Sequence, residues 1–500
     1  MDLKSLINRQ GNTMQAMWVA MGSLSSFALA IVSAAILSRY FTKADYGTYR
    51  QILYVYSTLL LVFTAGLPTV FSYFLPRYNL EQGKDIVWKI TRVLFLLGML
   101  FSVFLFVFSE VIAGLLKNPE LGFGLRLFSP IPMLLLPTLG IEGIFSTYKK
   151  TFFIAVFNTL SRLLMLLFIV LPVIIFKGSY IYAIYGWLVV SVLTLAMAYI
   201  FKGIPFRGIK AEKTDLTYKD IFGYSLPLVA ASLWGIAIKS ADQFFISRYF
   251  GTEVFAEFSN GFIDIPFVGM ITGATATVLL PLFSKIVFDA KDKTRLDEVL
   301  TLWRSALTKS AILTYPIVVF FTFNAEIIVI LLYSDLYINS AVYFQIAMVL
   351  NFFNVIVFAP LLFALGETKF YSRMHMVFAF IAWGGGYLIV LLFNSPVALA
   401  VFSISMAVLR VLVALRYVSK LLSISFISLI PLRDFVILTL HSVLSIVLVK
   451  LVMMYLTPEL NGVASLIVIF AGFVITLLLT ARFLKLDYLS VVKPLIKKGF

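Results

Sequence analysis

The tetrapeptide Ser38-Arg39-Tyr40-Phe41 occurs a second time as Ser247-Arg248-Tyr249-Phe250. Each copy closes the first apolar stretch of a block of six. After a short polar connection the next stretch opens on a similar pattern, at residues 46–49 in one block and 255–258 in the other. One shared tetrapeptide is expected by chance in so long a chain, so the argument rests on this context. The pattern predicts two similar six-span halves, which is typical of transporters whose central path opens to either side in turn.

The composition predicts an all-α polytopic membrane protein. The chain is 61% hydrophobic and 13% charged, whereas soluble domains average about 45–50% apolar and about 25% charged residues. The apolar residues fall in blocks of about 20, the length that crosses the hydrocarbon core of a bilayer. The chain has no cysteine, which excludes disulfides and thiolate metal sites. We expect no metal site and no cofactor.

About 14 transmembrane helices are predicted from the apolar blocks. They lie near residues 14–38, 49–74, 90–113, 125–146, 151–176, 180–201, 221–247, 255–283, 310–333, 340–365, 370–393, 397–419, 434–456 and 462–482.

The positive charge is distributed unevenly between the two sides of the predicted membrane. With the N-terminus placed inside, most of the 40 Lys and Arg residues fall on the inner side. The positive-inside rule therefore predicts that both termini are cytoplasmic. The net charge of +16 is explained by topology, and a nucleic-acid partner is not expected, because no basic soluble domain or stacking platform is evident.

The seventh predicted span carries polar side chains on one helical stripe. Ser232, Lys239 and Asp242 follow one another at steps of seven and three residues. Lys239 and Asp242 are close enough along a helix to touch. These residues either line a cavity or form a neutralised pair near the outer end, with Lys239 reaching toward the headgroups.

The fifth predicted span places Arg162 near the middle of the membrane, with Asn158 one turn earlier. An arginine at this depth that faced lipid would cost at least ~2.5 kcal/mol. We therefore expect Arg162 to face a hydrated cavity, with a structural pair to a neighbouring helix as the alternative.

Four further charged residues are candidates for a site. Asp264 and Glu326 could bind a coupling ion or proton, or could instead neutralise a nearby base. Arg50 and Arg248 lie at outer helix ends, where ligand contact and plain topological placement remain equally open.

Three passages of the sequence are similar to those of a known family. The chain resembles the O-antigen type lipid-linked oligosaccharide flippases, which are polysaccharide-biosynthesis membrane proteins of the multidrug/oligosaccharidyl-lipid/polysaccharide exporter superfamily. The passages are Leu37-Ser38-Arg39-Tyr40-Phe41 running on to Asp45-Tyr46-Gly47-Thr48-Tyr49, Phe222-Gly223-Tyr224-Ser225-Leu226-Pro227-Leu228, and Asp242-Gln243-Phe244-Phe245-Ile246 with Phe250-Gly251-Thr252-Glu253 and Phe255-Ala256. The chain departs from the usual Gly-Tyr of the third passage at Ala256-Glu257-Phe258. It also lacks the first-span arginines of the peptidoglycan-precursor branch.

The resemblance implies a V-shaped fold of two pseudo-symmetric six-helix lobes around a central cavity. Residues 1–201 would form the N-terminal lobe, 202–220 a cytoplasmic loop between lobes, and 221–422 the C-terminal lobe. Residues 423–500 would add two helices, which help to hold a lipid tail, and a basic cytoplasmic tail.

The substrate implied by the resemblance is an oligosaccharide on undecaprenyl pyrophosphate. It would move from the cytoplasmic to the periplasmic leaflet of a bacterial inner membrane for O-antigen, capsule or exopolysaccharide synthesis. Membrane lipid, a polysaccharide polymerase and a chain-length regulator are the expected partners. Arg162 and Lys239 are expected to attract the pyrophosphate, with Asn158, Ser232, Arg50 and Arg248 beside them. The membrane potential, or an ion bound by Asp242, Asp264 or Glu326, would drive the movement.

Two other functions compete with this one. A cation-coupled multidrug antiporter of the same superfamily typically has twelve spans and binds cations with intramembrane carboxylates, which the extra spans and basic interior argue against. A membrane polysaccharide polymerase usually presents a large outer loop. The outer connections here are short and carry no acid pair or nucleotide motif, so the chain is not expected to be an enzyme.

Overall fold

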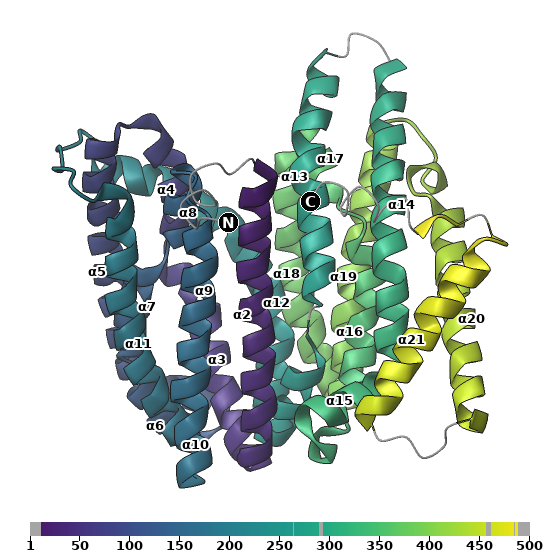
Figure 1. Cartoon of the computed structure of the whole chain (residues 1–500), viewed down its shortest axis with the longest axis horizontal. Coiled ribbons are helices and arrows are strands. Elements are labelled where there is room, and N and C mark those ends of the chain that lie inside the picture. Colours follow the sequence, from purple (N-terminus) through teal and green to yellow (C-terminus); the bar gives the residue numbers. More distant parts are fainter. Residues whose placement is uncertain (1–11, 264, 290–293, 457–461, 485, 489–500) are drawn as a thin grey trace, which may run out of the picture. The chain divides into compact units, whose positions relative to one another are not determined.

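The computed structural model describes residues 12–263, 265–289, 294–456, 462–484 and 486–488. All regular elements in these ranges are helices (Figure 1). The chain divides into two compact units, residues 1–256 and 257–500, which we describe separately. The boundary falls inside the range predicted as the second lobe, and the division into lobes by sequence repeat stays a prediction.

The first unit is built from eleven α-helices and short 3-10 or π turns, among its described residues. In order these are α2 (Asn12–Tyr40), α3 (Lys43–Phe63), α4 (Leu67–Phe74), η1 (Leu75–Arg77), α5 (Leu80–Leu115), α6 (Pro119–Phe128), α7 (Ile131–Leu135), η2 (Leu136–Thr138), α8 (Ile141–Thr147), α9 (Phe152–Met165), η3 (Leu166–Val170), α10 (Leu171–Phe176), α11 (Tyr180–Gly203), η4 (Ile204–Phe206) and α12 (Tyr218–Gly261), whose last residues pass into the second unit. Helix α9 packs against both α2 and α11, as Figure 1 shows.

The second unit continues with α-helices only, apart from two short 3-10 turns, in the part that the structure describes. The elements are α13 (Pro266–Asp289), α14 (Thr294–Phe323), α15 (Ala325–Tyr333), η5 (Asp335–Tyr337), α16 (Ser340–Asn354), α17 (Phe358–Ala364), α18 (Thr368–Phe393), α19 (Pro396–Leu421), η6 (Ile427–Leu429), α20 (Leu432–Leu456) and α21 (Gly462–Ala481). The last two helices pack against each other and α20 also packs against α14.

The number of membrane spans agrees with the sequence prediction. Twelve helices of the described chain are long and apolar enough to cross a bilayer, and the number rises to 14 if two pairs bent by 43° each count as one span. The bent pairs are Lys43–Phe63 with Leu67–Arg77, and Tyr218–Ala230 with Ser232–Gly261. The predicted all-α polytopic fold class is confirmed.

The eighth predicted span, 255–283, is not one helix. Helix α12 ends at Gly261 and α13 begins at Pro266, whose ring nitrogen has no hydrogen to donate to a preceding turn. Gly251 also interrupts α12 with a backbone φ of 84°, a left-handed value that glycine adopts without steric cost. Both tetrapeptide copies therefore lie at a helix end, because α2 stops at Tyr40.

The fourth span is broken into α6, α7, η2 and α8. Pro137 lies in η2, and Gly140 after it has a φ of +88°. A Cβ atom at Gly140 would lie 2.1 Å from the ring of Phe71, so only glycine fits at this turn. Lys202 of α11 is 1% exposed, and its ammonium donates hydrogen bonds to the carbonyl of Pro137 at 2.7 Å and to the hydroxyl of Thr91 at 3.0 Å. The break is thus held by a buried lysine.

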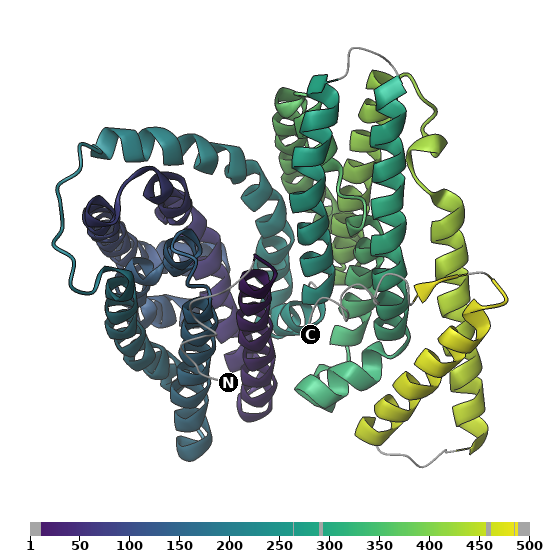
Figure 2. The ribbon, with the colours of Figure 1, turned by 45° about the horizontal axis from the view of Figure 1, so that its top comes forward.

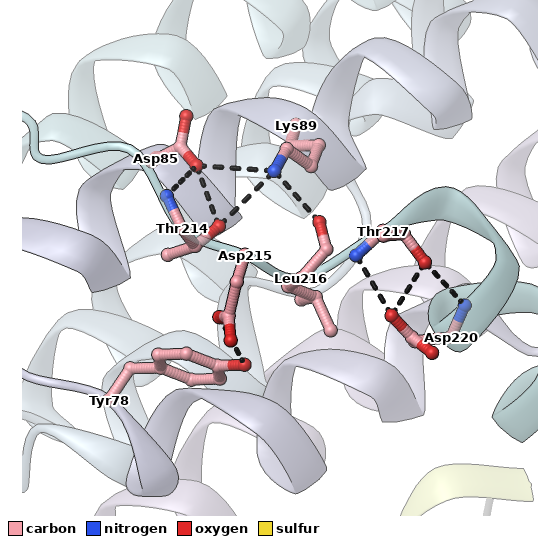
Figure 3. A network of polar contacts seen from close by, with 8 residues as sticks. All are labelled: Tyr78, Asp85, Lys89, Thr214, Asp215, Leu216, Thr217 and Asp220. Carbon is pink, nitrogen blue, oxygen red and sulfur yellow. Dashed lines mark hydrogen bonds and ion pairs between the residues drawn. The ribbon is translucent and has the colours of Figure 1, made fainter.

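The connection between α11 and α12 is attached to the first unit by polar contacts. It runs as an extended trace along the side of this unit (Figure 2), and Figure 3 shows its attachment to α5. Asp85 accepts hydrogen bonds from the backbone N–H of Thr214 at 3.0 Å and from its hydroxyl at 2.8 Å. Lys89 lies 3.3 Å from Asp85 and donates to the carbonyl of Leu216 at 2.9 Å.

The same connection makes a weaker contact with Tyr78. Its phenol donates to the carboxylate of Asp215 at 3.4 Å (Figure 3). Loss of hydration, followed by this negative neighbour, raises the pKa of Tyr78 above its usual value. A tyrosine with its ordinary pKa is already protonated at neutral pH, so the shift only extends the donor form to more alkaline pH.

Candidate functional site

A polar cavity of about 530 Å³ lies inside the first unit. Its walls come from α2, α3, α9, α11 and the broken fourth span. Serine, threonine, asparagine and charged side chains alternate there with apolar ones, as in a hydrated site and not a lipid-filled one. The lining residues are Ser23, Ser26, Phe27, Ala30, Tyr56, Leu135, Thr138, Leu139, Glu142, Phe157, Asn158, Ser161, Arg162, Met165 and Thr194.

Arg162 lies in this cavity on the last turn of α9. Its Nε donates a hydrogen bond to the hydroxyl of Ser26 at 2.9 Å, and much of the side chain remains exposed. In the part of the chain that the structure describes, no carboxylate lies within salt-bridge distance of the guanidinium. An arginine is always charged in proteins and presents five N–H donors, so Arg162 can bind an anion.

Arg50 lies near Arg162 at a second, smaller cavity of about 140 Å³. Both arginines line it, together with Tyr49 and Trp187. The indole N–H of Trp187 donates to the Tyr49 hydroxyl at 2.9 Å, which fixes both rings at the wall. Two of the arginines named from the sequence are thus brought together.

Asn158 joins the first cavity to a third, of about 730 Å³. Both cavities are lined by Asn158 and by Glu142 of α8. The amide of Asn158 donates to the Glu142 carboxylate at 3.1 Å. The polar lining therefore passes from Arg50 through Arg162 to this amide–carboxylate pair.

The candidates on α12 do not line these three cavities. Ser232 is exposed and its hydroxyl donates to the carbonyl of Leu228 at 2.9 Å. Lys239 is also exposed. Asp242 is 8% exposed and accepts a hydrogen bond from the backbone N–H of Gln243 at 2.6 Å. Lys239 and Asp242 thus have different surroundings although they share one helix face.

Arg248 has a partner in the described structure. Its guanidinium donates to the carbonyl of Leu115 at the end of α5 and lies 5.7 Å from the ring centre of Tyr249. The last carbonyls of a helix lack partners within the helix, so this contact caps α5.

Of the two remaining acidic candidates, Glu326 lies in the second unit and Asp264 lies outside the described residues. Glu326 is exposed in the first turn of α15. It interacts electrostatically with Lys450 of α20, whose ammonium donates to the carbonyl of Phe323. Glu326 therefore has the nearby base that the sequence analysis left as an alternative.

Glu142 was missed by the sequence analysis. It is the acidic residue of the predicted span 125–146, and an ionisable group at membrane depth indicates a functional site. The position of Glu142 inside a predicted span was therefore a signal that the sequence contained. What the sequence could not give was the partner, because Asn158 belongs to the next span.

Comparisons with known proteins identify relatives of the chain. Residues 36–342 match a family described as "Polysaccharide biosynthesis protein". The succinoglycan biosynthesis transport protein ExoT of Rhizobium meliloti (strain 1021) is 24% identical over 299 residues. That alignment covers 58% of this chain and spans 57% of the relative's length.

Solved structures show the same fold. The lipid II flippase MurJ in an inward closed conformation has a TM-score of 0.67 at 15% identity, over 94% of this chain and 99% of that one. An inward-facing multidrug resistance MATE family transporter has a TM-score of 0.62 at 11% identity, over 80% and 94% of the two chains. The matching family model confirms the resemblance to polysaccharide-biosynthesis proteins that the sequence indicated. The chain is a multi-pass membrane protein that belongs to the polysaccharide biosynthesis protein family.

Proposed function

We propose that this protein is a flippase for an oligosaccharide linked to undecaprenyl pyrophosphate. It moves the headgroup by alternating access from the cytoplasmic to the periplasmic leaflet of a bacterial inner membrane, with both termini in the cytoplasm. Family membership supports a role in polysaccharide synthesis. The observation that carries the proposal is a polar cavity containing an exposed Arg162 at membrane depth.

The cavity meets the physical requirement of headgroup transfer. A glycan with a pyrophosphate cannot cross hydrocarbon unaided, because its hydrogen bonds and charges would be unsatisfied there. Arg162 and Arg50 offer charge-assisted hydrogen bonds to phosphate oxygens, and serine and threonine side chains supply further partners. Lys239 is a second candidate cation, outside the three cavities.

An apolar cavity in the second unit suits the polyprenyl chain. It has a volume of about 440 Å³, and its lining is hydrocarbon and phenylalanine from α14, α15 and α21, with Tyr488 as the polar exception. A polyprenyl chain already lies in hydrocarbon, so van der Waals packing against this lining, and not removal from water, would retain it there. The added C-terminal helices would therefore hold lipid, while the headgroup occupies polar surroundings elsewhere.

The proposal is tested in a strain that lacks this protein. Loss of the protein should trap the lipid-linked glycan on the cytoplasmic leaflet, and the wild-type chain should restore surface polysaccharide. Exported but unpolymerised repeat units in the deletion strain would instead indicate a polymerase. Normal polysaccharide together with lost export of cationic dyes would indicate a multidrug antiporter.

A further inference from the structure

Glu142 and Asn158 form a paired acceptor and donor on the wall of the largest of the three cavities in the first unit. Glu142 is exposed on the first turn of α8 and Asn158 is half-buried on α9. Their side chains are joined by the 3.1 Å hydrogen bond. In the described chain no lysine, arginine or histidine lies within salt-bridge distance of the Glu142 carboxylate. The pair is therefore a polar, anionic feature open to a ligand.

A stacked pair of tyrosines also lines this cavity. The rings of Tyr73 and Tyr224 are stacked with centres 3.7 Å apart, and the Arg77 guanidinium lies 3.6 Å from the centre of Tyr73. Two groups so close to one ring centre must occupy opposite faces. Both faces of Tyr73 are taken, so it bounds the cavity and offers a ligand only its edge.

The dimensions suit a sugar residue. The volume of about 730 Å³ lies within the roughly 300–1,000 Å³ of typical ligand sites. A carboxylate accepts up to about four hydrogen bonds, and an amide both donates and accepts. Neighbouring sugar hydroxyls, which also donate and accept, match this combination.

The position on α9 links the pair to Arg162. Asn158 and Arg162 are four residues apart on one helix, which places their Cβ atoms about 5–6 Å apart on the same face. A pyrophosphate at Arg162 would therefore present its first sugar to Asn158 and Glu142. The negative charge of Glu142 would repel a sugar that carries its own carboxylate.

We infer that Glu142 and Asn158 form a sugar-binding subsite that accepts a neutral or amino sugar next to the pyrophosphate and discriminates against an acidic one. This inference rests on the proposed function, because it takes the ligand to be a lipid-linked glycan. Glu142 is a specificity determinant here, and Asn158 positions its carboxylate.

The experiment measures binding of three defined lipids to the full-length protein in lipid nanodiscs, by native mass spectrometry. The probes are undecaprenyl pyrophosphate and its galactosyl and galacturonosyl derivatives, which differ from each other only at C6. The variants are Glu142→Gln, which keeps the shape and removes the charge, and Asn158→Ala. Glu81→Gln is the matched control, because Glu81 is an exposed carboxylate on α5 that does not line the cavity.

Wild type should bind the galactosyl lipid about fivefold or more tightly than the galacturonosyl lipid, as repulsion between two charges in a hydrated site predicts. Glu142→Gln should bring this ratio to about one and Asn158→Ala should reduce it; the ratio is taken within each variant, so that a change in affinity for the bare carrier does not alter it. The control should keep the full ratio. An unchanged ratio in Glu142→Gln, in a variant that still binds the bare carrier, would overturn the subsite alone. Absence of carrier binding by wild type would overturn the proposed function and the subsite together.

Discussion

Gln51 of α3 donates a hydrogen bond from its side-chain amide to the hydroxyl of Ser247, in the second tetrapeptide, at 2.7 Å. Both residues are buried. The Gln51 carbonyl in turn accepts from Asn118 at 2.6 Å, and Asn118 also donates to Thr48 at 3.0 Å. A satisfied buried network of this kind specifies one arrangement of its helices, so it joins α3 to α12.

Breaking this network should lower stability. Gln51→Ala leaves the amide of Asn118 short of a partner, which should cost about 1–3 kcal/mol. A double-mutant cycle of Gln51→Ala and Ser247→Ala, measured by thermal unfolding in detergent, should give a coupling energy above about 0.5 kcal/mol. Ser232→Ala is the control, since that hydroxyl is exposed and bonds only within its own helix. Additive losses from the two variants would refute the coupling.

Gly47 should not tolerate a side chain. A Cβ atom there would lie 2.0 Å from the carbonyl oxygen of Thr252, so Gly47→Ala should force α3 away from α12 and lower the free energy of unfolding by about 1–3 kcal/mol. Gly235→Ala is the matched control, because nothing lies within 4 Å of its Cβ position. Thermal unfolding of the two variants checks this, and equal melting temperatures would contradict it.

Replacing the buried Lys202 should lower the stability of the fold. Lys202→Met keeps most of the volume but leaves the Pro137 carbonyl unsatisfied, at a cost of about 1–3 kcal/mol. Lys202→Ala adds a void, for a loss of about 2–5 kcal/mol. The melting temperature should be highest for wild type, lower for Lys202→Met and lowest for Lys202→Ala. Lys420 is exposed, so the control variant Lys420→Ala should melt like wild type. A Lys202→Ala variant as stable as wild type would show that the buried contacts contribute nothing.

Arg162 should be required for transport, and a lysine should replace it poorly. A lost charge-assisted contact costs about 1.5–3 kcal/mol, so Arg162→Ala should reduce surface polysaccharide roughly tenfold to a hundredfold. Arg162→Lys keeps the charge but loses the planar arrangement of N–H donors. It should give an amount of surface polysaccharide between those of wild type and Arg162→Ala. Arg126→Ala is the control, because Arg126 pairs with Glu110 at an exposed position. Full activity of Arg162→Ala, at equal protein levels, would exclude the role.

The connection between α11 and α12 should become sensitive to protease when its anchor on α5 is removed. Asp85→Ala deletes the acceptor of two Thr214 hydrogen bonds and the partner of Lys89. Trypsin should then cut faster after Lys210 and Lys213 in the detergent-solubilised protein, because cleavage follows local opening. Asp215→Asn removes only the charge from a 3.4 Å contact with Tyr78 and should change the rate little. Equal rates for the two variants would contradict an anchor at Asp85.

The sequence predicts the helices well and their interruptions poorly. Continuous apolar blocks reveal the spans, because hydrocarbon demands about 20 apolar residues whatever the packing. The break at Gly140 depends on Phe71 of another helix. The interruption before Pro266 has a visible proline, but prolines are tolerated in unbroken membrane helices too. The predicted span 255–283 therefore missed the break, because Pro266 in the sequence does not by itself distinguish a kink from an interruption.

The sequence could identify single residues of the candidate site, but not which of them lie next to one another in space. Arg162 stands out because a charge at membrane depth needs protein or water around it, and the structure gives it Ser26 and a cavity. Its neighbours come from separate spans whose order in space a single sequence does not contain. For the same reason the predicted cytoplasmic loop 202–220 included Lys202, which the structure places at the end of α11, buried.

The anchored connection limits where α12 can rearrange. Asp85 and Lys89 hold residues 214–216, so the beginning of α12 cannot swing freely as it would on a loose tether. Any reorientation of the later part must be absorbed farther along, at the 43° bend between Ala230 and Ser232 or at Gly251. Because Ser247 is also held by Gln51 of α3, a change in the direction of α12 would be concentrated at the bend between these two attached segments.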